Sequence, residues 1–117
     1  MDRLLKSYCN LLKISTFDFT GDSHANDLPR YRHIFYYCVK TKYSNVRLRH
    51  IAKISGKKTS GVGYGIKKIA SLVTPITKAG SSKNLITPEM RMVKDCVDSF
   101  LSICEEYKEK DLKLPLK

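Results

Sequence analysis

A stretch rich in glycine and lysine, SGKKTSGVGYGIKK at residues 55 to 68, has the clearest chemical potential in the chain. Glycine lets backbone N–H groups approach a phosphate closely, and lysine supplies the positive charge. An ATP-binding P-loop needs a glycine five residues before its Gly-Lys pair, and Ile51 occupies that position. A dinucleotide-binding loop needs a preceding strand, whereas the residues before Gly56 have helical spacing. The stretch therefore predicts phosphate contacts without a nucleotide cofactor, and a turn without any ligand is the alternative.

Other residues capable of chemistry do not form a recognisable active site. Asp22, His24 and Asp27 could chelate a metal, but a polar loop explains them more simply. We expect His33 and His50 to lie on helix surfaces, where they could contact phosphate. The cysteines lack the paired spacing of a zinc site and lie among apolar residues, so we expect reduced, buried thiols rather than a disulfide; they are Cys9, Cys38, Cys96 and Cys104. We expect neither enzyme activity nor a metal or cofactor.

The net charge of +11 is unevenly distributed along the 117 residues. Thirteen Lys or Arg and no Asp or Glu lie between Leu28 and Pro88, whereas residues 1 to 27 hold three basic and four acidic residues, and residues 89 to 117 hold six and seven. A long acid-free stretch favours a polyanionic partner. No single helix sets its basic residues opposite a lipid-facing stripe, and no long apolar run or signal peptide is present. We therefore expect a cytoplasmic, nucleoid-associated protein that does not bind membranes.

The first third of the chain predicts two helices separated by a loop. Leucine and tyrosine recur at three- and four-residue spacing from Asp2 to Ile14. Residues 15 to 28 are rich in turn-forming residues and have no helical period, so we expect a loop that Phe17 and Phe19 anchor to the core. Pro29 suits the first turn of the next helix. Its buried stripe comprises Tyr31, Ile34, Phe35, Cys38 and Val39.

The middle of the chain has the pattern of a helix-turn-helix. We expect a short helix from Val46 to Ile54, capped by Ser44 or Asn45 and ending at Ser55 and Gly56. The next helix, capped by Thr59 or Ser60 and ending at Pro75, has an apolar side made of Val62, Ile66, Ile69, Leu72 and Val73. A short helix, a turn with glycine and a second helix are the order of a DNA-binding helix-turn-helix.

The end of the chain predicts a linker and a further helix. Residues 76 to 87 belong to a segment rich in Pro, Gly, Ser and Thr, which is typical of linkers. Thr87, Pro88 and Glu89 then form a helix start. The helix, expected over residues 88 to 110, carries an apolar stripe made of Met90, Val93, Val97, Phe100, Leu101, Cys104 and Tyr107. It either covers the domain of residues 1 to 75 or binds a partner, such as a second copy. The predicted fold is all-α.

Four segments of the chain resemble the C-terminal, origin-binding domain of the bacterial replication initiator DnaA. LLKISTFDF at residues 11 to 19 is similar to that family's Tyr-Tyr-Lys-Ile segment before an Asp-Leu pair, and RYRHIFYYCVK at 30 to 40 to its Arg-x-Arg-Gln helix. SNVRLRHIA at 44 to 52 is similar to its Thr-Asn-x-Ser-Leu-x-Glu-Ile-Gly helix, and GKKTSGV with GIKKI to its Gly-Arg-Asp-His-Ser-Thr-Val helix. The resemblance covers residues 5 to 73.

The resemblance implies a helix-turn-helix fold like that of this family, and roles for matching residues. Arg30 matches an arginine that enters the minor groove, and the segment from Lys57 to Gly61 matches the start of the major-groove helix. The family's Asp-His-Ser-Thr is replaced here by Lys58, Thr59, Ser60 and Gly61, which lack its acid and histidine. The initiator's ATPase domain has no counterpart, so we expect a stand-alone regulator or a protein of a mobile element or phage.

The sequence thus predicts a module that binds double-stranded DNA, with residues 59 to 73 in the major groove. The expected contact residues are Arg30, Arg32, Arg47, Arg49, Lys53, Lys57, Lys58, Thr59, Ser60, Gly61, Lys67 and Lys68. Two alternatives stay open. The chain could be a protein-interaction domain that keeps the fold, or it could bind RNA by stacking bases on the tyrosines interleaved with basic residues, which are Tyr31, Tyr36, Tyr37, Tyr43 and Tyr64.

Overall fold

The computed structural model of the protein describes residues 2–21, 28–77 and 87–108, and every regular element within these ranges is an α-helix. The predicted all-α class is therefore confirmed for this part of the chain. The helices are α1 (Asp2–Leu12), α2 (Thr16–Thr20), α3 (Leu28–Lys42), α4 (Leu48–Ser55), α5 (Thr59–Thr77) and α6 (Pro88–Cys104). Within the same ranges, none combines the length and the apolar character that crossing a bilayer requires.

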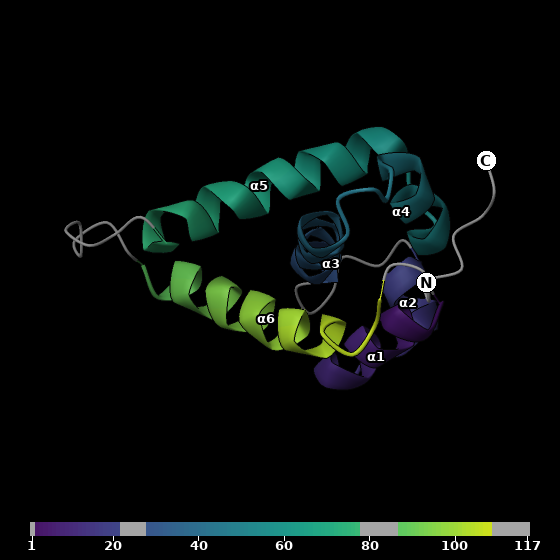
Figure 1. The fold of residues 1–117 in the computed structure, drawn as a ribbon, viewed down its shortest axis with the longest axis horizontal. Coiled ribbons are helices and arrows are strands. Elements are labelled where there is room, and N and C mark those ends of the chain that lie inside the picture. Colours follow the sequence, from purple (N-terminus) through teal and green to yellow (C-terminus); the bar gives the residue numbers. More distant parts are fainter. Residues whose placement is uncertain (1, 22–27, 78–86, 109–117) are drawn as a thin grey trace.

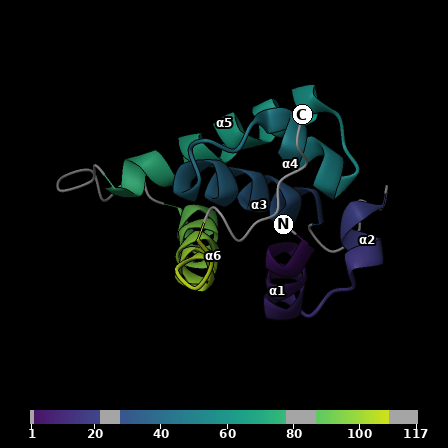
Figure 2. The same ribbon diagram turned by 45° about the vertical axis from the view of Figure 1, so that its right-hand side comes forward.

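Helix α3 lies at the centre of the arrangement. Helix α5 packs along one side of it, and α6 and α1 lie on the opposite side (Figures 1 and 2). The short α4 packs against α3 and the start of α5, while α2 joins α1 to α3. This order places α4 and α5 together on one outer side of the molecule.

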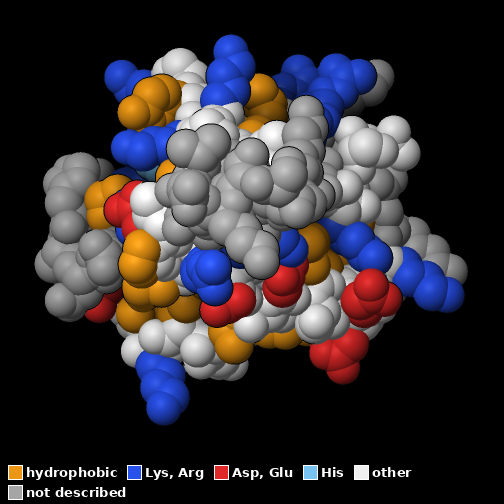
Figure 3. Space-filling view, turned by 90° about the vertical axis from the view of Figure 1, so that its left-hand side faces the viewer, with side chains coloured by type: hydrophobic (Ala, Val, Ile, Leu, Met, Phe, Trp, Pro, Cys, Tyr) orange, Lys and Arg blue, Asp and Glu red, His pale blue; other side chains and the backbone are white. Residues whose placement is uncertain are grey.

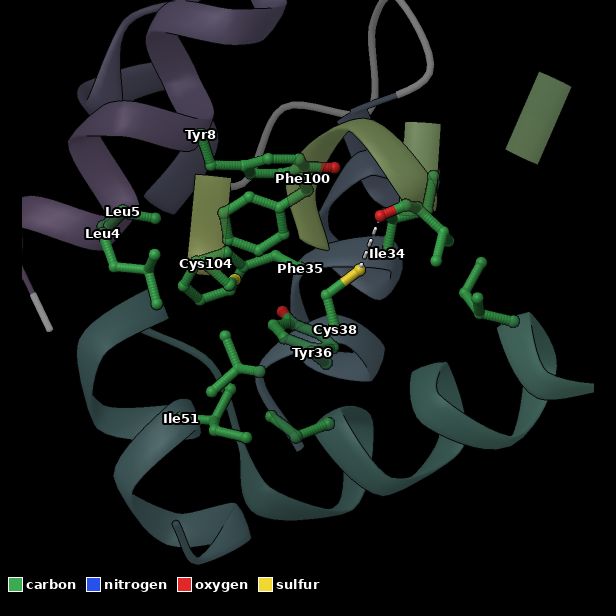
Figure 4. Packing of buried hydrophobic residues seen from close by; sticks show 14 of the residues in the cluster. Leu4, Leu5, Tyr8, Ile34, Phe35, Tyr36, Cys38, Ile51, Phe100 and Cys104 are labelled. Atoms are coloured by element: carbon green, nitrogen blue, oxygen red, sulfur yellow. Dashed lines mark hydrogen bonds between the residues drawn. The ribbon is translucent and has the colours of Figure 1, made fainter. Parts of the chain in front are cut away.

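Four aromatic rings from four different helices form the middle of the core. Phe35 of α3 lies 5.6 Å from Tyr8 and from Phe100, and 5.7 Å from Phe19, measured between ring centroids. The rings of Tyr8 and Phe100 are 4.4 Å apart, and Figure 4 shows them beside Phe35. All four side chains are fully buried. Because aromatic side chains bury large apolar areas, this cluster joins α1, α2, α3 and α6 into one core.

Helix α6 is an integral part of this core. Its buried residues are Met90, Val93, Val97, Phe100 and Cys104. Cys38 of α3 donates its S–H to the carbonyl of Val97 at 3.8 Å (Figure 4), and the Tyr43 hydroxyl donates to the carbonyl of Cys104 at 3.0 Å. Of the two arrangements that the sequence left open, α6 thus adopts the one in which it packs on the domain.

The start of α6 has the expected cap. The Thr87 Oγ1 accepts the backbone N–H of Met90 at 3.1 Å, Pro88 opens the helix, and Glu89 lies in the first turn. A proline costs nothing here because its missing N–H has no helical partner. The end differs from the prediction, since α6 stops at Cys104 rather than continuing to residue 110. A turn closes it, in which the Glu105 N–H donates to the carbonyl of Leu101.

The expectation of a loop at residues 15 to 28 was wrong in part, because residues 16 to 20 form α2. Ser15 caps this helix by accepting the Asp18 N–H at 3.0 Å. Five residues are too few to show a helical period. Residues two apart on a helix point about 200° apart, so Phe19 is buried while Phe17 is 82% exposed and does not anchor the segment. The candidate metal ligands at residues 22 to 27 lie outside the described residues.

Three other predicted boundaries were also wrong. Helix α4 begins at Leu48 with Arg47 as its cap, not at Val46 after Ser44 or Asn45. Helix α5 already includes Thr59, and the Lys58 carbonyl accepts the N–H groups of Gly61 and Val62. It also continues past Pro75 to Thr77, because a proline in the last turn of a 19-residue helix removes only one backbone hydrogen bond. The predicted linker therefore loses residues 76 and 77 to α5, and residues 78 to 86 lie outside the description.

Candidate nucleic-acid interface

A three-residue connection, Gly56 to Lys58, joins α4 to α5 at a sharp angle. Gly56 has φ 70°, the left-handed conformation that favours glycine, as the sequence predicted. A Cβ at this position would also lie 3.3 Å from the carbonyl oxygen of Thr20. The Lys57 N–H donates back to the Ala52 carbonyl at 2.9 Å. The turn is thus fixed by backbone geometry, by this hydrogen bond and by close packing on the end of α2.

Lys57 tethers this turn to the end of α2. Its Nζ donates to the backbone carbonyl of Gly21, at the end of α2. The side chain is partly buried, unlike that of Lys58, which is exposed. Of the two neighbouring lysines, Lys58 therefore projects its charge into solvent, whereas Lys57 contributes to the position of the turn.

Helix α5 approaches α3 closely at Gly65. A Cβ on Gly65 would lie 2.5 Å from Cδ2 and 2.9 Å from Cγ of His33, closer than non-bonded carbon atoms can come, and in tight contact with Cδ2 of Tyr36 at 3.0 Å. Nothing lies within 4 Å of a Cβ at Gly61, and only Leu48 would be near one at Gly63. The contact at Gly65, together with buried Val62 and Ile69, offsets the low helix propensity of glycine. Of the three glycines in the segment GVGYG, Gly65 is therefore the one that close packing against α3 explains.

The outer face of α5 consists of small, aromatic and basic side chains. Its exposed residues are Thr59, Ser60, Gly61, Tyr64, Lys67, Lys68 and Ser71. Their spacing places Ser60, Tyr64, Lys67 and Ser71 along one side of the helix. The ring of Tyr64 is 61% exposed, and the Nζ of Lys68 lies 5.8 Å from its centroid. This face carries positive charge without any carboxylate.

Helix α4 adds three exposed cations beside this face: Arg47, Arg49 and Lys53. In the part of the chain that the structure describes, none of them forms an ion pair. The Nδ1 atom of His50 accepts the Arg47 N–H at 3.4 Å. This nitrogen therefore helps to cap the start of α4. Its Nε2 atom is buried without a partner. His50 therefore does not offer a nitrogen to the surface, in contrast to the expectation.

A shallow pocket of about 230 Å³ lies between the starts of α3 and α5. Its lining is basic and aromatic and comprises Pro29, Arg32, His33, Tyr36, Lys57, Lys58 and Gly61. His33 is partly buried, and its ring meets that of Tyr64 edge-on at 5.9 Å. The pocket opens beside the first turn of α5, where free backbone N–H groups favour anions.

Two predicted contact residues do not lie free on this surface. Arg32 is only 5% exposed, and its guanidinium donates to the carbonyls of Phe19 at 2.6 Å and Asp18 at 3.0 Å. Its role is to hold α2 against α3, because its buried donors satisfy carbonyls at the end of a short helix. Arg30 forms an ion pair with Glu89 of α6 at 2.7 Å. Arg32 is therefore not free to contact a phosphate. Arg30 can contact one only when its ion pair with Glu89 is broken.

Charge separates the two sides of the molecule. Helices α3, α4 and α5 contain no acidic residue, whereas α6 and the turn after it carry Glu89, Asp95, Asp98, Glu105 and Glu106. In Figure 3, Lys and Arg without acidic neighbours lie at the top, on the side of α5, whereas in the middle and lower parts Lys and Arg lie among the Asp and Glu side chains. The α4–α5 face, defined as the exposed residues of Arg47 to Ser71, is thus a concentrated positive surface.

Desolvation and the positive charges of this surface both lower the pKa of two histidines, His33 and His50. Partial burial lowers the pKa of His33, and the charges of Lys68, Arg32 and Arg30 lower it further. Desolvation and the charges of Arg49, Arg47 and Lys53 lower the pKa of His50 in the same direction. Both imidazoles are therefore neutral at neutral pH, and the charge of the face comes from its lysines and arginines.

The cysteines are placed as packing residues. Cys9, Cys38 and Cys104 are buried, and Cys96 is partly buried. Burial raises the pKa of Cys9 and of Cys104 to about 11, and it raises the pKa of Cys38 as well. Such thiols stay protonated and are poor nucleophiles. Over residues 2–21, 28–77 and 87–108, no three His, Cys, Asp or Glu side chains gather in a way that could hold a metal ion.

Sequence reasoning missed the structural roles of Arg32 and Lys57, since nothing in their spacing distinguishes a buried cation from an exposed one. It also missed the pocket between α3 and α5. No protein-family model matches the chain, and neither the curated proteins nor the solved structures contain a significant match.

Proposed function

We propose that α4 and α5 form a helix-turn-helix that binds double-stranded DNA, with α5 in the major groove. The observation that supports this most is the α4–α5 face, which gathers exposed cations on two helices and a tight turn without a single carboxylate. An α-helix about 10–12 Å across fits a major groove about 12 Å wide. Cations that release the counter-ions of DNA supply most of the affinity of such modules.

The proposed contacts fall into two groups. Arg47, Arg49 and Lys53 of α4, with Lys58 of the turn and Lys67 and Lys68 of α5, bind phosphates on the two sides of the groove. The hydroxyls and backbone N–H groups of Thr59 and Ser60 approach a phosphate at the start of α5, where the helix dipole favours an anion. Gly61 lets the backbone come near the DNA, because its surroundings are open.

Lys57 acts differently from the other lysines in this proposal. Its bond to the Gly21 carbonyl makes it a positioning residue for the turn. Replacing it would shift α5 relative to α2 as well as remove a charge. Tests of phosphate contact are therefore better made at Lys58 and Lys67, whose side chains are exposed.

The resemblance to the DnaA origin-binding domain supports the same function but not the same target. The turn and the following helix resemble that family, whereas the residues at the family's base-reading positions differ. Lysine, hydroxyl and glycine at residues 58 to 61 suit phosphate better than the bidentate base contacts that discriminate sequence. We therefore propose a DNA-binding regulator of the nucleoid, of replication or of a mobile element or phage, without assigning it the initiator's box sequence.

Fluorescence anisotropy of labelled DNA tests this function. The protein would be titrated onto a DnaA-box duplex, a scrambled duplex and a single strand, each at low and at higher salt. We expect both duplexes to bind with a dissociation constant below about 100 μM at low salt, as non-specific DNA binders do, and more weakly at higher salt. Failure to bind either duplex, or preference for the single strand, would contradict the proposal.

The structure gives less support to the two alternative functions. The apolar stripe of α6, which was the candidate partner surface, is buried against the rest of the domain, and only Met92 of its large apolar residues is well exposed. For RNA binding, five tyrosines were candidates for stacking. Tyr36 and Tyr43 are buried, and Tyr31 and Tyr37 are partly buried, so only Tyr64 offers an open ring.

A further inference from the structure

Among the side chains of α5 that the structure describes, residues 59 to 74, Tyr64 is the only large apolar one that is exposed. Its side chain is 61% exposed. One turn before it lies Gly61, which has no side chain and has open space around it, and one turn after it lies Lys68. Residue 61 therefore places no side chain against the ring.

Two neighbours hold this exposed ring in place. His33 of α3 meets it edge-on at 5.9 Å, with the ring planes 79° apart, and the Nζ of Lys68 lies 5.8 Å from its centroid. His33 is in turn placed by Tyr36, 6.0 Å away. A surface tyrosine that is oriented from two sides loses little freedom on binding, which is the property of an anchor residue.

The chemistry around Tyr64 limits what it can recognise. In the major groove the 5-methyl group of thymine is the apolar feature of the base edges, and apolar side chains read it by contact. Lys58, Thr59 and Ser60, at the start of α5, contact phosphates or base edges mainly through hydrogen bonds, and the methyl group of Thr59 is their only apolar group that suits thymine. Tyr64 is one turn further on, on the same side of the helix as Ser60 and Lys67.

We propose that Tyr64 reads the 5-methyl group of thymine, and that this contact gives the module a preference for particular A·T positions. The inference rests on the proposed insertion of α5 into the major groove. The lysines that flank Tyr64 bind phosphates on either side, and the ring between them lies on the base edges. In this proposal, sequence specificity comes from Tyr64 and not from the first turn of α5.

Replacing thymine by uracil tests the contact at the level of one methyl group. Two duplexes made only of A·T or only of A·U pairs would be titrated with the wild-type chain and with Tyr64→Ala. Burial of one methyl is equivalent to about fourfold in affinity, so we expect the wild type to bind the thymine duplex at least about fourfold more tightly. Tyr64→Ala should bind both duplexes equally, at the affinity of the wild type for the uracil duplex.

Two further variants provide matched controls. Tyr64→Phe keeps the ring and should keep the preference for thymine. Lys67→Ala removes a phosphate contact from the same face and should weaken binding to both duplexes by the same factor. Tyr64→Gln keeps a long side chain with good helix propensity but without the ring, and it repeats the test if Tyr64→Ala unfolds at a lower temperature.

The outcomes separate the inference from the function on which it rests. A preference for thymine that persists in Tyr64→Ala and Tyr64→Gln would overturn the inference, because the preference would then come from DNA shape or another residue. Equal binding of both duplexes by the wild type would also overturn it while leaving DNA binding intact. If the wild type binds neither duplex, the proposed function itself fails.

Discussion

The α4–α5 face and the α6 side share one core but differ in how their charges are arranged. On α6 acidic and basic residues are mixed, and several are paired, as in Lys94 with Asp98 at 2.6 Å. On the α4–α5 face the cations have no acidic neighbour on their own helices. Paired surface charges serve solubility, whereas crowded like charges oppose folding slightly and suit a polyanionic partner. The difference fits a role of α6 in completing the fold and supports our proposal that the opposite face binds DNA.

The largest expected effect is on stability, and it tests whether α6 belongs to the core. Phe100→Ala removes a fully buried ring that contacts Tyr8 and Phe35. It should lower the free energy of unfolding by about 3–5 kcal/mol, as measured by urea denaturation. Met92→Ala, on the exposed side of the same helix, should change it by less than about 0.5 kcal/mol. Equal stability of Phe100→Ala and wild type would show that α6 is an appendage.

Two glycines on α5 offer a second test, because they differ only in their surroundings. Gly65→Ala forces a methyl group into His33 and Tyr36 and should destabilise the protein by about 1–3 kcal/mol. Gly61→Ala meets open space and should stabilise α5 by up to about 1 kcal/mol. Thermal unfolding of both variants would measure this. An unchanged or higher melting temperature of Gly65→Ala would mean that α5 does not approach α3 this closely.

A smaller effect is expected where the two sides meet, at the ion pair of Arg30 with Glu89. Glu89→Gln should release Arg30 and steepen the dependence of log affinity for DNA on log salt by about 0.9, the effect of one added phosphate contact. The loss of stability should stay below about 1 kcal/mol, because the pair is exposed. Asp98→Asn changes the net charge equally but breaks the pair with Lys94 instead of the pair with Arg30, so a similar change in slope there would contradict the role of Arg30.

The smallest effect is on the pH dependence of stability. Because the folded protein lowers the pKa of His33 below its usual 6.5, the unfolded chain binds the proton more readily. The free energy of unfolding should therefore fall as the pH drops below about 6.5. His33→Gln should reduce this loss of stability at low pH. His50→Gln should reduce it as well, because the pKa of His50 is also lowered. Urea unfolding of each variant near pH 7.5 and near pH 5 would measure the difference.

Much of the fold followed from local patterns in the sequence. The apolar spacing of α1, α3, α5 and α6 predicted these helices, and Thr87 with Pro88 and Gly56 marked a start and a turn because their chemistry acts on adjacent residues. The short α2 was missed because five residues show no period. The extension of α5 past Pro75 was missed because a proline near the end of a long helix removes little.

The candidate site was less predictable than the fold. Charge counting located the basic middle of the chain, but burial depends on contacts between distant residues. Arg32 is buried because α2 ends against α3, and Arg30 is paired because α6 returns to the start of α3. Both contacts join residues of different helices, and the spacing of residues along the sequence does not predict them. The exposure of Tyr64 among mostly buried tyrosines likewise depends on the crossing at Gly65.

The salt dependence of DNA binding tests the central claim most directly. Lys58→Ala with Lys67→Ala removes two cations from the α4–α5 face, and Lys6→Ala with Arg91→Ala removes two exposed cations from α1 and α6. Both double variants lower the net charge equally. We predict that the slope of log affinity against log salt flattens by about 1.8 in the first variant and stays unchanged in the second. Equal flattening in both would show that binding follows overall charge and would contradict a DNA-binding face on α4 and α5.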